Sequence, residues 1–136
     1  MAQEEGLRSI TLNADDSLAV YTGVPGMVGS PNPNYGKQYR FVKVTGSRKA
    51  GLADADDVVV GVLQSKPQVV GQEATIGIRG VSNVMVGEVL NPGDLVVSDA
   101  EGRAVKAGTG ATALGVVIES TAKAANQLAS VLLRIN

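Results

Sequence analysis

An apolar stretch built around a Gly-Val pair occurs twice in this chain and constrains the fold more than any other feature. The first copy spans residues 58–67 with Gly61 near its centre, and the second spans residues 113–121 with Gly115. Similarity between two stretches of one chain at a fixed spacing indicates that a structural unit has been duplicated.

Two further apolar runs flank each copy. The runs before the glycines are residues 42–46 and 105–108, and the runs after them are residues 74–79 and 130–135. The spacing between equivalent runs is not constant, because Lys106 lies farther from Lys43 than Gly115 lies from Gly61. Since only two copies are present and their offset drifts, we expect a pseudo-symmetric domain of two three-strand β units, not a solenoid.

The composition favours one all-β domain without catalytic chemistry. A chain of 136 residues suits a single domain with a real core. Seventeen glycines and 3% aromatic residues are typical of short strands joined by tight turns. The absence of cysteine and histidine removes thiol nucleophiles, disulfides, imidazole bases and most metal ligand sets. We therefore predict no catalytic, cofactor-binding or metal-binding residues, no cofactor and no enzyme activity.

Charge and hydropathy exclude two classes of partner. The chain carries 12 Lys and Arg against 13 Asp and Glu, so it lacks the basic surface that nucleic acids select. No apolar run approaches the roughly 20 residues that span a bilayer. The acidic opening Met-Ala-Gln-Glu-Glu is also unlike a signal peptide. We expect a protein that is soluble where it is made and binds neither nucleic acid nor membranes.

Alternating apolar residues and turn signals predict the strands. A hairpin is expected at residues 95–98 and 103–107 around the loop 99–102, after a turn in which Pro92 precedes Gly93. Val62 and Val116 are predicted to take matching core positions. We interpret residues 46–57 as a polar connection and 119–129 as a loop with at most one helical turn. The other expected strands are 38–45, 58–63, 74–80, 81–89, 113–118 and 130–135.

Residues 1–37 are predicted to form an extended N-terminal arm ahead of a β-barrel or β-sandwich domain at 38–136. The arm has few apolar residues, and its prolines and glycines disfavour a regular core element. One interpretation is a disordered tail. The other is a segment that orders on a neighbouring subunit or capsid, because a solvating tail needs no exposed apolar side chains. The apolar residues expected at that interface are Val24, Met27, Val28 and Tyr35.

Three local motifs suggest chemistry that their context excludes. Asp54 opens a calcium-like acidic run, but the required glycine is replaced by Val59 and the bidentate glutamate by Ser65. The glycine-rich residues 108–110 lead into a strand pattern, so no helix N-terminus is available for phosphate. The turn at residues 91–96 is similar to strand entries of biotin- and lipoyl-carrying domains, but the expected hairpin tip carries no lysine.

The order of the motifs resembles the small capsid decoration, or cement, proteins of tailed bacteriophages. The resemblance covers residue 39 to the C-terminus and depends on order and spacing, because each motif alone is an ordinary strand or turn. The motifs are Tyr39-Arg40-Phe41-Val42-Lys43-Val44, Gly61-Val62-Leu63-Gln64-Ser65-Lys66-Pro67, Gly80-Val81, Asn91-Pro92-Gly93-Asp94-Leu95-Val96, Asp99-Ala100-Glu101-Gly102-Arg103-Ala104 and Leu114-Gly115-Val116-Val117-Ile118-Glu119.

The resemblance implies an all-β structural protein of the virion, made in the host cytoplasm. It would bind the major capsid protein on the outer surface of the expanded head and stabilise that head. Decoration proteins commonly form trimers at threefold and quasi-threefold positions, so self-association is also implied. A homotrimer agrees with the need of a small domain to cover its strands with neighbours.

Two alternatives remain open at this point. One is a different virion component, such as a tail-tube, fibre or host-glycan-binding module. Exposed aromatic rings would then be expected to stack on sugar, and the only tyrosines are Tyr21, Tyr35 and Tyr39, in or beside the arm. The other alternative is an enzyme or carrier domain, which the missing histidine and cysteine disfavour.

Overall fold

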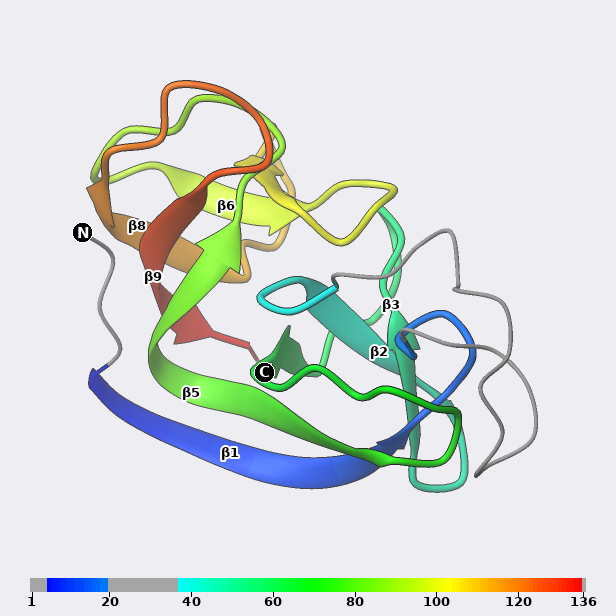
Figure 1. Cartoon of the computed structure of the whole chain (residues 1–136). Coiled ribbons are helices and arrows are strands. Elements are labelled where there is room, and N and C mark those ends of the chain that lie inside the picture. Colours follow the sequence, from blue (N-terminus) through cyan, green and yellow to red (C-terminus); the bar gives the residue numbers. More distant parts are fainter. Residues whose placement is uncertain (1–4, 20–36, 136) are drawn as a thin grey trace.

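The computed structural model describes residues 5–19 and 37–135, and this part of the chain folds into strands, turns and loops without a helix (Figure 1). The all-β prediction is confirmed. No described segment is a helix of the length and apolarity needed to cross a membrane. The strands are β1 (Glu5–Ala14), β2 (Phe41–Gly46), β3 (Lys49–Leu52), β4 (Gly61–Leu63), β5 (Glu73–Met85), β6 (Leu95–Ser98), β7 (Ala104–Lys106), β8 (Gly115–Ser120) and β9 (Leu128–Arg134).

The first five strands close into a ring. β2 pairs with β3 and with β4, and β4 pairs with the first part of β5, in each case antiparallel. β1 then pairs antiparallel with β5 and parallel with β3, which joins the two ends of the array. We call this ring the N-terminal barrel.

A second ring continues from the same long strand. From Arg79 onward β5 pairs with β9, and the sheet continues through β8 and β6 to β7. Gly80, near the start of this part, has a φ of 106°. A parallel bridge between Val86 and Ala104 closes this array. We call it the C-terminal barrel. Figure 1 shows how β5 runs from one barrel into the other, so the two barrels share one continuous strand.

The second barrel repeats the strand pairing of the first. The strand β1 opens the first barrel, and the second part of β5 opens the second. The first part of β5 closes the first barrel, and β9 closes the second. The pair Ile10 and Ile76 therefore corresponds to the pair Ser82 and Val131. The middle strands β2, β3 and β4 correspond to β6, β7 and β8 at one constant offset, the same that separates Gly61 from Gly115. The predicted duplication is therefore present, and each copy includes five strands instead of three.

Hydrogen bonds outside the strands repeat as well. The Asp15 N–H donates to the Ala50 carbonyl at 2.9 Å, and the corresponding Gly87 N–H donates to Ala104 at 2.8 Å. Three positions of the repeat have a left-handed backbone in both copies, and at each position one of the two equivalent residues is not glycine. The pairs are Tyr39 and Gly93 (φ 67° and 94°), Arg48 and Gly102 (57° and 73°), and Asn126 and Gly71 (68° and 90°). The two copies thus share turns as well as strands.

Each barrel has its own apolar core, and the buried residues that line the N-terminal core have buried counterparts in the other. Glycines at the start of β4 and β8 allow the neighbouring strand to approach, because a Cβ at Gly61 or Gly115 would lie 2.3 or 2.6 Å from a backbone oxygen. The matched core pairs are Ala14/Val86, Leu18/Leu90, Val42/Val96, Ala50/Ala104, Leu63/Val117, Ala74/Ala129 and Ile76/Val131.

The structure corrects the predicted alignment of the repeats. Lys43 does not correspond to Lys106, because β2 matches β6 and not β7. The offset changes by one position at the bulge between Val117 and Glu119, where Ile118 is the added residue. Residues 46–57 are not only a connection, since they contain β3. That strand was missed because its sequence, Lys-Ala-Gly-Leu, has neither the length nor the alternation of a strand pattern.

The expectation that the chain before residue 37 lies outside the core is wrong for residues 5–19. β1 belongs to the N-terminal barrel, and Leu18 and Ala19 are buried. Residues 15–40 connect the first two strands of this barrel, whereas the much shorter stretch 87–94 makes the same connection in the other. The first copy thus carries an inserted segment relative to the second, and the insertion coincides with the proline- and glycine-rich part of the predicted arm.

Several turn predictions are confirmed. Gly93 and Gly102 adopt the positive φ that the turn at 91–94 and the hairpin loop at 99–102 require. The loop predicted at 119–129 contains no helix, but it is shorter than expected, because β8 extends to Ser120 and β9 begins at Leu128. The strand predicted at 58–63 is shorter than expected: it begins at Gly61, and Val58 is 82% exposed.

Candidate interaction surfaces

Three arginines form a row across adjacent strands. Arg8 on β1 lies opposite Arg79 on β5, and Arg79 lies opposite Arg134 on β9. All three are exposed, and no ion pair found among the described residues includes them. Like charges directly opposite each other destabilise a sheet, so an anionic partner bound at this row would relieve the repulsion.

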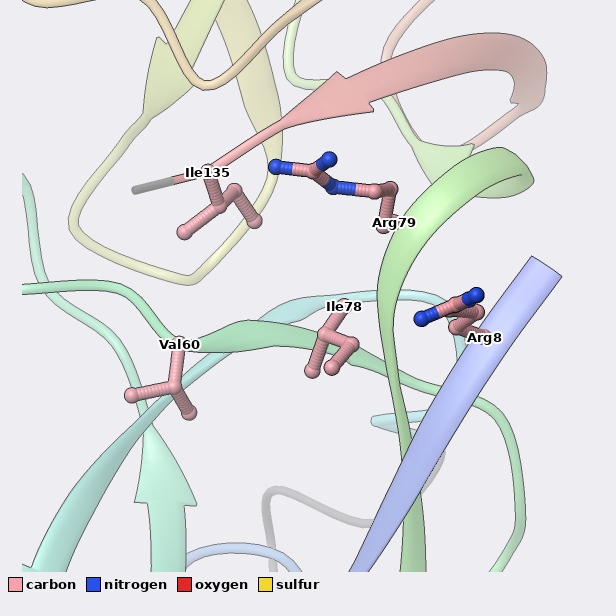
Figure 2. A pocket seen from close by; sticks show the side chains of 5 residues that line it. All are labelled: Arg8, Val60, Ile78, Arg79 and Ile135. Carbon is pink, nitrogen blue, oxygen red and sulfur yellow. The ribbon is translucent and has the colours of Figure 1, made fainter.

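An open groove of about 560 Å³ lies beside this row. Figure 2 shows Arg8 and Arg79 on one side of the groove, with Val60 and Ile135 across from them and Ile78 between. Guanidinium groups bind carboxylates and phosphates through paired hydrogen bonds, and the aliphatic wall would contact apolar parts of the same partner. The groove therefore suits an acidic surface with apolar residues next to its carboxylates.

The C-terminal barrel carries a second surface, which is apolar. Leu95 is 48% exposed, Ile118 is 46% exposed and Val116 is half-buried. In the N-terminal barrel the residues corresponding to Leu95 and Val116 are Phe41 and Val62, and both are fully buried. Val62 therefore takes the predicted core position, but Val116 does not, because the C-terminal barrel covers only the face that contains Val62.

A polar cluster joins the two barrels. Arg40 donates to the Glu101 carbonyl at 3.0 Å, and Arg103 is paired with Asp99 at 2.9 Å and with Glu101 at 3.0 Å. Burial lowers the pKa of the Arg40 guanidinium, and the nearby Arg103 lowers it further. Burial also lowers the pKa of Lys37, and the charge of Arg40 adds to that effect. We interpret this cluster as a contact that helps to hold the barrels together, because the hydrogen bond from Arg40 to the Glu101 carbonyl crosses the joint.

The interface residues expected from the sequence, Val24, Met27, Val28 and Tyr35, lie outside the described residues. Of the three tyrosines weighed for sugar stacking, Tyr39 is described, and it packs partly buried against the C-terminal core. The acidic run is structural, since the Asp57 carboxylate accepts from the Lys43 ammonium at 2.8 Å and from the Asp54 N–H. No cluster of three or more potential metal ligands occurs within residues 5–19 and 37–135.

The sequence contained part of the signal for the arginine row. Arg79 and Arg134 occupy the same position of the repeat, directly after the aligned Ile78 and Leu133. Arg8 joins them only through β1, which the sequence did not predict. The exposed apolar face was missed for a different reason. The repeat predicts equal burial for equivalent residues, but burial depends on what covers each copy.

Comparisons with known proteins identify a fold and no family. No protein-family model matches the sequence, and no curated protein does. Among solved structures, the chain is similar to the crystal structure of the head fiber gp8.5 N base of bacteriophage phi29. The two share 16% sequence identity over 96% of each chain, with a TM-score of 0.62. At this identity the likeness establishes the shared fold.

Proposed function

We propose that this protein is a structural component of a phage virion, bound to the outer surface of the capsid. The observation that carries the proposal is the likeness to a phage head fiber base, because it extends over 96% of both chains and not over one barrel alone. The similarity of the motif order to that of capsid decoration proteins supports the same role. The protein would act by binding and would catalyse no reaction.

In the first version of this role the protein is a cement protein. It would bind the major capsid protein as a homotrimer at threefold and quasi-threefold positions and stabilise the expanded head. The arginine row supports a capsid contact, because three adjacent cations favour an acidic surface. Val24, Met27, Val28 and Tyr35 of the inserted segment would add apolar contacts to the capsid or to a neighbouring copy.

The second version is the base of a fibre that projects from the head. The solved structure with the similar fold is itself named a head fiber base, which favours this version specifically. A cement protein and a fibre base would both bind the capsid exterior, but they differ in what the binding does. Cementing raises the stability of the head, whereas a fibre base needs only to remain attached.

The experiment that tests the role is binding to expanded heads that lack the protein. We expect the purified protein to sediment with the heads and to saturate at a fixed stoichiometry, since a lattice offers a fixed number of sites. Protection of the heads against heat or chelator would identify a cement protein, and saturable binding without protection would identify a fibre base. Failure to bind the heads at all would contradict both versions.

A charge reversal tests the part played by the arginine row. The double variant Arg79→Glu, Arg134→Glu should bind heads more weakly than the wild type, and the wild-type affinity should fall as salt is added. Lys66→Glu together with Lys123→Glu applies the same charge change elsewhere on the described surface and serves as the control. Equal binding by both double variants would exclude the row as the capsid contact.

A further inference from the structure

The contact between the two barrels of one chain is well defined. Phe41 and Val62 on the outer face of the N-terminal barrel join the core of the C-terminal barrel. Two backbone hydrogen bonds of 2.7 Å connect the barrels, from the Phe41 N–H to the Gly102 carbonyl and from the Met85 N–H to the Tyr39 carbonyl. The C-terminal barrel thus covers its neighbour with the end of β5 and the β6–β7 turn.

The C-terminal barrel has the counterpart of the covered face, but nothing in the chain as described covers it. Leu95 and Val116 are the counterparts of Phe41 and Val62 in the repeat, and Ile118 lies on the same strand as Val116. Leu95 and Ile118 remain about half exposed at 48% and 46%. Apolar side chains grouped on one face of a sheet mark a binding surface.

We propose that this face binds the N-terminal barrel of a second copy of the chain, in the same arrangement that joins the two barrels within one copy. The proposal rests on the self-association included in the proposed function and specifies the surfaces that it uses. The repeat identifies the groups that would meet the face. Arg48 is the counterpart of Gly102, Ile10 is the counterpart of Ser82, and Asn13 is the counterpart of Met85.

The apolar residues support this arrangement. Within the chain, the Gln64 side chain reaches from the N-terminal barrel and donates to the Ser82 hydroxyl at 2.8 Å. At the joint between two copies, the counterpart of Ser82 is Ile10, which is 39% exposed, and the bulge of β8 adds the exposed Ile118 between the counterparts of Leu63 and Gln64. Where the single chain has a polar contact, two copies would thus bring two exposed isoleucines together.

The charges are complementary in the same arrangement. Within the chain, the Arg40 side chain packs beside Gly102. The counterparts of these two residues are Asp94 and Arg48, which carry opposite charges. A contact between two copies would therefore place a carboxylate next to a guanidinium. Opposite charges at matched positions select this pairing of surfaces over a pairing of two identical faces.

Forming the contact between two copies would break one backbone hydrogen bond within the N-terminal barrel. In the single chain the Asn13 N–H donates to the Arg48 carbonyl at 2.7 Å, so the groups that would receive the second copy bond to each other. Binding would replace this bond with two: Leu95 N–H to the Arg48 carbonyl of the other copy, and its Asn13 N–H to the Gly93 carbonyl. Each of these four backbone groups would then have a partner, so the contact would bury none of them unpaired.

Cysteine cross-linking tests the contact directly, because the chain contains no cysteine of its own. Leu95→Cys and Arg48→Cys are prepared as two separate proteins, then oxidised alone and as an equal mixture. We expect a disulfide-linked dimer from the mixture and none from either protein alone, since the two surfaces are different. A dimer from Leu95→Cys alone would show identical faces in contact and overturn the proposal.

A second variant measures the association without a cross-link. Leu95→Asp should weaken self-association by about tenfold or more in light scattering, because a carboxylate would enter the apolar contact. Val89→Asp is the control: Val89 is 50% exposed, and its counterpart Ser17 bonds only within its own barrel. Equal association by both variants, or a wild type that stays monomeric at the highest attainable concentration, would overturn the proposed contact. Capsid binding would still be judged by the head-binding experiment.

Discussion

The two barrels have the same strand pairing, the same left-handed turns and matched cores, yet they differ in what surrounds them. The N-terminal barrel has a much longer connection between its first two strands, and one of its outer faces is buried by its neighbour. The C-terminal barrel has a short connection, and the same outer face is open to solvent. The two copies therefore share one fold, whereas the position of each copy in the chain determines which of its surfaces are available for binding.

The difference is visible in single residues. Phe41 is fully buried and its counterpart Leu95 is 48% exposed, although both stand at the start of equivalent strands. Conversely, Ser82 is fully buried and its counterpart Ile10 is 39% exposed. The polar Ser82 is thus buried at the joint between the barrels, and the apolar Ile10 lies away from that joint. Apolar residues at these exposed positions are what the proposed contact with a second copy requires.

Removing β1 should have the largest effect, because it breaks one barrel and leaves the other closed. Deletion of residues 1–14 opens the ring, exposes both edges of the gap and removes Ala14 from the core. We expect a loss comparable to the whole stability of a small domain, roughly 5 kcal/mol or more. The measurement is urea unfolding followed by circular dichroism. A cooperative transition at the wild-type midpoint would show that β1 is dispensable.

A pair of aspartate substitutions tests the unequal burial of equivalent residues. Val62→Asp places an unpaired carboxylate in the joint between the barrels and should cost about 3–5 kcal/mol. Val116→Asp places the same charge on the open face and should cost about 1 kcal/mol or less. Thermal unfolding of the two variants under conditions that keep the protein monomeric compares them. Equal costs would contradict the assignment of one covered and one open face.

Two substitutions at one position of the repeat should have opposite signs. Gly102→Ala should destabilise by about 1–3 kcal/mol, because a Cβ there meets Leu52 at 2.7 Å and the Phe41 carbonyl at 2.9 Å, at a φ of 73°. Arg48→Gly relieves the left-handed backbone of a non-glycine residue and should stabilise by about 0.5–1 kcal/mol. Chemical denaturation measures both, and a destabilised Arg48→Gly would indicate that its side-chain contacts outweigh the strain.

The smallest expected effect concerns an ion pair present in one barrel only. Lys43 and Asp57 bond at 2.8 Å, while the corresponding residues are Val97 and Ala111. The hydrogen bond from Lys43 lowers the pKa of Asp57, so the folded state binds its proton less tightly than the unfolded state. The stabilisation is present above the ordinary aspartate pKa and is lost as the pH falls through the lowered value.

Asp57→Asn should therefore lessen the decline of stability in acid, and added salt should weaken the wild-type effect because the two side chains are still 34% and 29% exposed to solvent. Unfolding midpoints measured along a pH series compare the two proteins. An unchanged acid decline in the variant would mean that other carboxylates account for it.

Much of the fold was predictable from the sequence because the repeat and the turns have local signals. The Gly61 and Gly115 strands, the hairpin around residues 99–102 and the turn at Gly93 were predicted, and each follows from residue types at fixed spacing. β3 and β1 were not predicted. β3 is too short for a periodic pattern, and β1 alternates apolar with polar residues only weakly, so long-range pairing with β5 decides its structure.

The candidate surfaces were less predictable, because each depends on segments that meet only in the folded chain. The arginine row combines residues from three strands that are far apart in sequence. The open face is defined by a comparison of burial between Leu95 and Phe41, which no sequence pattern gives. The predicted interface in the arm, at Val24, Met27, Val28 and Tyr35, stays a prediction.

A cryo-electron microscopy map of the protein bound to expanded heads tests the central claim most directly, because it shows both the location of the protein and what covers each barrel. We predict copies on the capsid exterior, with the face of Leu95, Val116 and Ile118 buried against the N-terminal barrel of a neighbouring copy. Heads without the protein, or bound copies whose C-terminal face stays open to solvent, would contradict the account.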